Sequence, residues 1–510
     1  PVYGGTGSGS MSKQYKTVSL LDGMKQAGLK TNTELSKLYT DYRKDRPEVG
    51  MFAQDWTLPE VPAKQYSDKL VSDAKDFSDE AVVVLTRVGG EGADLPTDMK
   101  AKGITYKNNS KDYDDFQKGE SFLQLSKTER DMIDLVTSNF KKVTLVYNGA
   151  NTFQFDFLND YPQIQSVVWC PPAGQTGFSA LGEVLAGETN PSGKTSDTFL
   201  KDLTKSVSYN NFGKFEYTNM ADKAAKYKGF TGDDVTAIPG FVNYSEGIYV
   251  GYKFYETASD EGLINYDDTV AFPFGYGLSY TSFDQKLDSV KYKGGKVTVT
   301  ATVTNTGDKD VVEAYYNPPY TDGGIEKASK NLAGFEKTKE LQPGESQKVT
   351  VKFDDDDMAS YDYKGAKAYV LEKGDYDISI QSDSHHVIDH KAITVKDTVT
   401  YDSDSNTHNG DKTVATNQFD DVAGDVTYLS RADHFANYKE ATAAPTNFKM
   451  SDKAKETFYN NSNYDPKKFD KDSDKMPTTG AKNGLKLSDM YGKDYDDADW
   501  DKLLDQLTFD

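Results

Sequence analysis

Residues 81–94 read AVVVLTRVGGEGAD, a short apolar run followed at once by a loop with three glycines around Glu91. The run Ala81 to Leu85 is rich in β-branched residues, which is typical of strands buried in a parallel sheet. The loop therefore falls at the carboxyl end of a strand, the edge at which open α/β sheets bind ligands. Glycines let such a loop carry a carboxyl group into a cleft, so Glu91 is a candidate functional residue. The alternative is a solvated surface glutamate.

The sequence on either side of this loop predicts further strands of the same sheet and helices that cover it. Apolar runs at 143–147 and 164–169 predict two further strands. A capping box at 126–129 predicts the start of a helix, and apolar residues at helical spacing predict helices over 18–27 and 180–185. This alternation of strands and helices predicts an α/β domain over residues 1–283, an open and mainly parallel sheet covered by helices.

After residue 283 the period of the apolar residues changes to two. Strands with one buried face are predicted at 297–303, 349–353 and 376–380, with glycine turns between the apolar runs. Residues 284–396 are therefore predicted to form a small antiparallel β-sandwich. Residues 397–484 are rich in Asp, Asn, Thr and Lys and predict an irregular linker that packs on its neighbours, while the apolar residues of 485–510 look like the opening of another domain.

The composition narrows the classes of function. The chain of 510 residues has a formal net charge of −22, which repels nucleic acid and anionic membrane surfaces. No apolar run reaches the ~18 residues of a membrane-spanning helix. The single cysteine, Cys170, excludes an internal disulfide framework and fits a packed thiol. Neither zinc-ligand spacing nor a dinucleotide or Walker motif occurs, so we expect no metal and no cofactor.

Several ordered segments carry a family resemblance. They are the loop at 87–94, the NPSGK turn at 190–194, the segment YSEGIYVGYKFY at 244–255 and the segment PFGYGLSYTSF at 273–283. In this order they resemble the α/β sandwich domain of glycoside hydrolase family 3, and the β region resembles the fibronectin III-like domain that follows it in many members. The resemblance implies that residues 244–255 form a helix, on which Glu246 would be a structural ion-pair or capping group.

The resemblance also implies an unusual order of domains. In the usual family order a (β/α)8 barrel comes first and carries the aspartate nucleophile, while the α/β domain lends the acid/base glutamate. Here residues 483–487 and 500–508 resemble the start of that barrel, placed last and interrupted at Asp510. The nucleophile is then expected on a barrel beyond residue 510, in the same precursor or on a second chain.

Roles for individual residues follow from the same resemblance. Glu91 matches the family's acid/base loop. Thr6 and Ser8 lie in a glycine-rich loop that resembles a family segment near the substrate, so they and Asp94 are expected to contact substrate. Where relatives often have Arg after the loop aspartate, this chain has Leu95, which puts one sugar or loop contact in doubt.

The expected function is that of a retaining, exo-acting glycoside hydrolase of the β-glucosidase type, which hydrolyses terminal non-reducing β-D-glucosyl residues. A β-xylosidase type and a non-catalytic carbohydrate-binding or scaffold fragment are the alternatives. The expected partners are a β-glucoside or oligosaccharide substrate and the barrel domain, without which the chain should be inactive. No nucleic acid or membrane partner is expected, a homo-oligomer is considered, and the sequence leaves the compartment open.

Overall fold

The computed structural model describes residues 2–12, 14–45, 54–213, 215–229, 232–305, 309–418 and 426–508. The chain divides into two compact units. The first joins residues 1–215 to 242–446, and the second joins residues 216–241 to 447–510. The first unit holds the α/β domain and the β-sandwich, and it contains every residue that the sequence nominated for a site.

The α/β domain is built on a parallel sheet. Its strands lie in the order β1, β2, β3, and they span Glu80–Thr86, Lys142–Asn148 and Ile164–Cys170. The register places Val83 beside Leu145, and Leu145 beside Val167. The three strands predicted from their apolar runs are confirmed, and so is their parallel arrangement.

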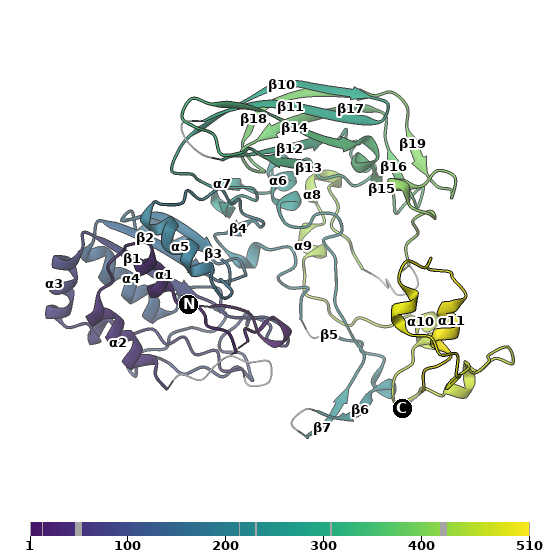
Figure 1. Cartoon of the computed structure of the whole chain (residues 1–510), viewed down its shortest axis with the longest axis horizontal. Helices are drawn as coiled ribbons and strands as arrows, with labels where there is room; N and C mark the ends of the chain where they lie inside the picture. Colours follow the sequence, from purple (N-terminus) through teal and green to yellow (C-terminus); the bar gives the residue numbers. More distant parts are fainter. Residues whose placement is uncertain are drawn as a thin grey trace. The chain divides into compact units, whose positions relative to one another are not determined.

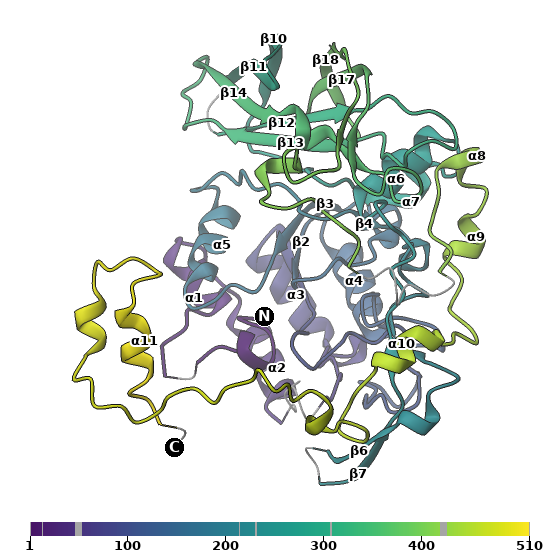
Figure 2. The same ribbon diagram turned by 90° about the vertical axis from the view of Figure 1, so that its right-hand side faces the viewer.

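Helices cover both faces of this sheet (Figures 1 and 2). On one face Met132 and Ile133 of α4 pack with Leu145. On the other face α1 and α5 lie side by side and pack on Val146 through Leu20 and Phe178. The α4 helix begins at the predicted capping box. The helices of this part of the chain are α1 (Leu20–Gln26), α2 (Thr33–Arg43), α3 (Asp68–Phe77), α4 (Lys127–Asn139) and α5 (Gly177–Ala186).

The helix predicted over 244–255 begins later than the sequence indicates. The structure has a helix, α6, only over Tyr252–Asp260, followed by the short α7 at Tyr266–Thr269. Gly251, which precedes α6, has φ +58° and ψ −134°, a backbone conformation that interrupts a helix. Glu246 therefore precedes the helix. Its Oε2 is buried without a hydrogen-bond partner, and no ion pair of its carboxylate exists within the described ranges, so the expected structural ion pair or cap is wrong.

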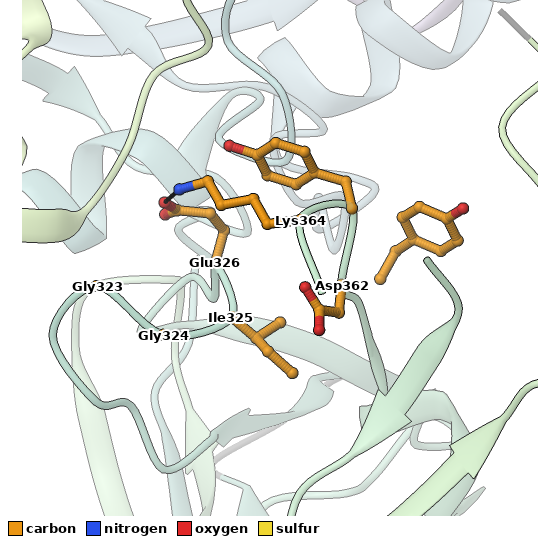
Figure 3. A pocket seen from close by; sticks show the side chains of 8 residues that line it. Gly323, Gly324, Ile325, Glu326, Asp362 and Lys364 are labelled. Atoms are coloured by element: carbon orange, nitrogen blue, oxygen red, sulfur yellow. Dashed lines mark ion pairs between the residues drawn. The ribbon is translucent and has the colours of Figure 1, made fainter. Parts of the chain in front are cut away.

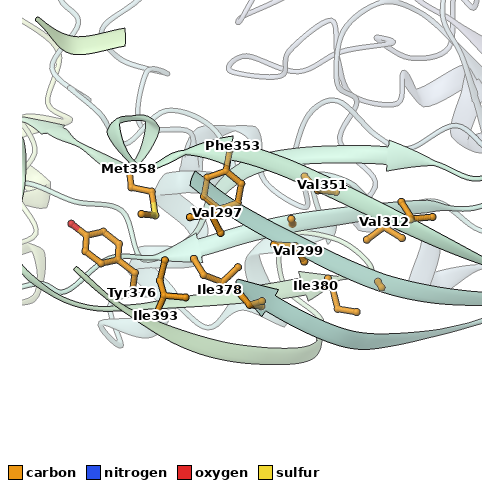
Figure 4. Close-up of a cluster of buried hydrophobic side chains, with 14 of the residues drawn as sticks. Val297, Val299, Val312, Val351, Phe353, Met358, Tyr376, Ile378, Ile380 and Ile393 are labelled. Atoms are coloured by element: carbon orange, nitrogen blue, oxygen red, sulfur yellow. The ribbon is translucent and has the colours of Figure 1, made fainter. Parts of the chain in front are cut away.

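The β-sandwich follows the predicted period of two. In β11 Val297, Val299, Ala301 and Val303 are buried while the residues that alternate with them are only partly buried. The buried side chains pack with Ile378 and Ile380 of the facing sheet (Figure 4). One sheet has the order β10-β11-β14 and the other β13-β12-β17-β18. Their bounds are β10 (Phe283–Lys293), β11 (Lys296–Asn305), β12 (Val311–Asn317), β13 (Asn331–Lys337), β14 (Ser346–Asp354), β17 (Gly374–Gln381) and β18 (Val387–Val395).

The second unit is less regular. It contains the hairpin of β6 (Ala225–Lys228) and β7 (Asp234–Ala237), and the short helices α10 (Asp452–Thr457) and α11 (Asp499–Leu504). Between residues 447 and 508 the structure has no strand. The start of a barrel at 485–510 therefore stays a prediction. In the described part of the chain, no helix combines the length and the apolar character that crossing a membrane requires.

Candidate active site

The loop that carries Glu91 starts from a buried anchor. Arg87 directly follows β1, and its side chain is fully buried. Its guanidinium donates to both carboxylate oxygens of Glu129, over 2.7 and 2.8 Å, and to the carbonyl oxygen of Gln124 over 2.6 Å. Glu129 is also the acidic member of the α4 capping box. A bidentate Arg–carboxylate pair is rigid, so this pair fixes the point from which the loop leaves the sheet.

Beyond this anchor, glycines form a tight turn with Glu91 at its apex. Gly90 has φ +152° and Gly92 has φ +70°, conformations that residues with a side chain rarely adopt. The amide of Ala93 donates to the carbonyl oxygen of Gly90 over 2.9 Å and closes the turn. A Cβ atom on Gly90 would lie 2.7 Å from the amide nitrogen of Thr6. Gly90 therefore has to be glycine for the amino-terminal loop to approach.

That approach joins three of the predicted site residues. The Thr6 hydroxyl donates to the backbone carbonyl of Glu91 over 2.7 Å. The amide and the hydroxyl of Ser8 both donate to Oε2 of Glu91, over 2.7 and 2.6 Å. Thr6 is buried, whereas Ser8 and Glu91 are exposed. The structure thus brings together two loops that lie more than eighty positions apart in the sequence.

The hydrogen bonds from Ser8 favour the ionised form of this carboxyl group. The Ser8 hydroxyl first, and the Ser8 amide second, hold the pKa of Glu91 below its usual range. A general acid needs a pKa raised toward neutral pH, whereas in this exposed loop the Ser8 hydrogen bonds shift the pKa of Glu91 in the opposite direction. The two hydrogen bonds therefore favour the ionised form of Glu91.

Asp94, the fourth residue predicted for the site, is not part of this hydrogen-bond network. It is exposed, and no hydrogen bond or ion pair links it to Thr6, Ser8 or Glu91 in the parts of the chain that the structure describes. Its expected contact with substrate stays a prediction, as do the roles of the other three residues.

One half-buried carboxyl group was not nominated from the sequence. Glu60 accepts hydrogen bonds at Oε1 from the Tyr39 hydroxyl, over 2.7 Å, and from the Val61 amide, over 3.0 Å. Burial raises the pKa of Glu60 to about 8. No glycine or motif flanks Glu60 in the sequence, so nothing local could have indicated this environment. Its Oε1 is held by hydrogen bonds within its own domain.

One cavity, the single cysteine and the acidic groups of the described chain give weaker candidates for a functional site. A cavity of about 220 Å³ lies between the segment Gly323–Glu326 and the turn Tyr361–Lys364 (Figure 3). The Glu326 carboxylate there pairs with Lys364 at 3.8 Å and also accepts from the Tyr249 hydroxyl over 2.7 Å, so packing already uses it. Burial raises the pKa of the half-buried Cys170 thiol, as expected of a packed group. No cluster of His, Cys, Asp and Glu suited to a metal ion occurs among the described residues.

Comparison with known proteins places this chain in a family. Residues 1–252 match the model of the glycosyl hydrolase family 3 C-terminal domain, and residues 310–384 match the fibronectin type III-like domain. The chain belongs to glycoside hydrolase family 3. Glu91, Thr6 and Ser8 all lie in the part that matches the family's C-terminal domain, and the α/β and sandwich folds expected from the resemblance are confirmed.

Relatives in this family cover most of the chain. A β-glucosidase of Ruminococcus albus is 32% identical over 405 residues, which is 77% of this chain and 36% of the relative. The structure is similar to a β-glucosidase from Paenibacillus barengoltzii, with 30% identity, a TM-score of 0.62, and coverage of 78% of this chain and 40% of that one. It is also similar to β-glucosidase 3B from Thermotoga neapolitana in complex with α-D-glucose, with 28% identity, a TM-score of 0.60, and coverage of 79% and 49%. The chain therefore spans less than half the length of these relatives.

Proposed function

We propose that this chain supplies the acid/base half of a retaining, exo-acting glycoside hydrolase of the β-glucosidase type, which removes terminal non-reducing β-D-glucosyl residues. One observation carries the proposal: Glu91 stands at the apex of a strand-end loop, exposed, with one carboxylate oxygen fixed by Ser8. The β-glucosidase names of the relatives support the choice of glucose.

The chemistry needs a second carboxyl group. Retaining glycosidases use two carboxyl groups about 5–5.5 Å apart, one as acid and base and the other as nucleophile. In the proposed mechanism Glu91 protonates the glycosidic oxygen and later removes a proton from water. The nucleophilic aspartate comes from a (β/α)8 barrel beyond residue 510, in the same precursor or on a second chain.

The proposed acid role of Glu91 depends on the barrel. An acid must hold its proton near neutral pH, whereas Ser8 lowers the pKa of Glu91 in this exposed loop. A barrel that covers the loop would desolvate the carboxylate and raise its pKa. The chain alone should therefore hydrolyse almost nothing, and robust hydrolysis of an aryl β-glucoside by the 510-residue chain would contradict a shared site.

The second candidate function is a carbohydrate-binding or scaffold fragment. It is favoured by the exposure of Glu91, whose carboxylate has, among the described residues, Ser8 as its hydrogen-bond partner and no second carboxyl group beside it. A β-xylosidase type differs only in the sugar, and the residues that select the sugar would lie mostly on the barrel.

The test compares Glu91→Gln with Glu188→Gln, a matched change of an exposed glutamate in the same domain. In the complete protein that includes the barrel, Glu91→Gln should lower kcat for an aryl β-glucoside by about 10²–10⁴-fold, the usual contribution of a general acid, while Glu188→Gln should not. Parallel assays with an aryl β-xyloside decide between the two sugars. Equal activity of the two variants would overturn the role of Glu91. Sugar binding without hydrolysis in both would support the non-catalytic alternative.

A further inference from the structure

The two carboxylate oxygens of Glu91 have different surroundings. Oε2 accepts two hydrogen bonds from Ser8, from its amide over 2.7 Å and from its hydroxyl over 2.6 Å. No described residue donates a hydrogen bond to Oε1. Both polar hydrogens of Ser8 therefore point at one oxygen, and the other oxygen of the same group is left for solvent or a ligand.

The backbone holds Ser8 in this position. The amide of Gly5 donates to the carbonyl oxygen of Gly9 over 3.0 Å, and the amide of Ser10 donates to Gly7 over 3.1 Å, so the loop closes on itself around Ser8. The bond from Thr6 to the Glu91 carbonyl ties this closed loop to the other one. The approach of Ser8 thus depends on backbone contacts in both loops as well as on the conformation of its own side chain.

We propose that Ser8 is a positioning residue for Glu91, which fixes Oε2 so that Oε1 is the oxygen that carries and transfers the proton. This inference rests on the proposed acid/base function of Glu91. It gives Ser8 a role different from the direct substrate contact expected from the sequence, because the amide and hydroxyl hydrogens of Ser8 are already used by the carboxylate.

The proton balance follows from this geometry. In the first half of the reaction the O–H bond at Oε1 and the bond between the anomeric carbon and the glycosidic oxygen break, and the barrel's aspartate bonds to the anomeric carbon. The alcohol leaves with the proton, so Glu91 becomes a carboxylate. In the second half water loses a proton to Oε1 while its oxygen replaces the aspartate at the anomeric carbon, which releases the aspartate as a carboxylate. Ser8 gains and loses no proton. Its two donors stabilise the ionised form that exists between the two halves.

The first experiment needs no activity. The 510-residue chain is labelled with ¹³C at the glutamate carboxyl carbons, and the Glu91 signal is identified by its absence in Glu91→Gln. We expect Ser8→Ala to raise the pKa of Glu91, because one of two hydrogen bonds to the carboxylate is lost. Ser8→Thr, which keeps the hydroxyl, should restore the lower value, and Ser10→Ala, a matched change at an exposed neighbour, should leave it unchanged. An unchanged pKa in Ser8→Ala would refute the inference.

The second experiment separates positioning from substrate binding in the complete protein. With an alkyl β-glucoside, whose departure needs a proton, Ser8→Ala should lower kcat by about tenfold to a hundredfold with little change in KM, since small misplacements of catalytic groups have costs of this size. With a dinitrophenyl β-glucoside, whose leaving group needs no proton, the rate constant of the glycosylation step should be the same in Ser8→Ala as in the native protein. A rise in KM for both substrates would instead make Ser8 a substrate contact and overturn the inference.

The results distinguish a failure of the proposed function from a failure of the positioning role of Ser8. If Glu91→Gln keeps full activity, the proposed function is wrong whatever the titration of Ser8→Ala gives. If Glu91→Gln is inactive but Ser8→Ala changes neither the pKa of Glu91 nor kcat for the alkyl glucoside, the function stands and the positioning role of Ser8 is wrong.

Discussion

Replacing Glu129 by alanine tests whether the buried pair with Arg87 holds the sheet edge that carries the Glu91 loop. The Arg87 side chain is fully buried, and only 5% of the Glu129 side chain is exposed. Removing one partner of a buried ion pair costs about 3–5 kcal/mol, because the other charge stays buried and unpaired. The half of the α4 capping box in which the Glu129 carboxylate accepts from the Ser126 amide is lost as well, a hydrogen bond of about 1 kcal/mol. Arg87 keeps carbonyl partners at Phe122 and Gln124, so we expect a total loss of about 3–5 kcal/mol.

The assay is urea unfolding followed by tryptophan fluorescence. Trp56 and Trp169 lie in the α/β domain, and Trp500→Phe in every variant removes the remaining tryptophan of the three in the chain. Glu80→Ala is the control, since Glu80 pairs with Lys142 at 3.1 Å on the surface and such pairs contribute less than about 1 kcal/mol. If Glu129→Ala costs no more than Glu80→Ala, the pair does not anchor the strand end and the argument is refuted.

Three further predictions concern the loop, the domain contact and the sandwich. Gly90→Ala should separate the two loops, because its Cβ would lie 2.7 Å from the Thr6 amide nitrogen; large amide shifts of both loops in NMR spectra would support this, and unchanged shifts would contradict it. His385 lies 2.9 Å from Glu256, which raises the pKa of His385 above the ordinary value of about 6.5. The stability from this contact is therefore fully present below about pH 6.5 and is lost as the pH rises through the raised pKa, so the melting temperature of His385→Gln should fall less over that range than that of the native chain. Ile380→Ala, at a fully buried core position, should cost about 2–5 kcal/mol in denaturant unfolding, and a loss below about 1 kcal/mol would show that the sandwich core relaxes around the gap.

Local sequence patterns were enough to predict most of the elements. The strand at 81–85, the helix after the capping box at 126–129 and the alternation at 297–303 all depend on side chains within one turn or one strand. The helix at 244–255 was placed too early because its start is decided by the backbone conformation of Gly251, which the residue type permits but does not require.

The candidate site was only partly visible in the sequence. Glu91 could be nominated because glycines surround it after a strand, and Thr6 and Ser8 only because of the family resemblance. The environment of Glu60, whose pKa burial raises to about 8, could not be predicted, since it depends on the distant Tyr39 and on burial.

By itself the sequence determined the two fold classes, the position of the glycine loop and its acidic residue, because apolar period and glycine content act over a few neighbouring residues. Only the tertiary structure decided which groups meet there. Ser8 and Glu91 are 83 positions apart, and Arg87 and Glu129 are 42 apart. These contacts form because the packed sheet brings the loops and α4 to the same edge, and no local pattern specifies which loops will meet or which carboxylate oxygen receives the hydrogen bonds.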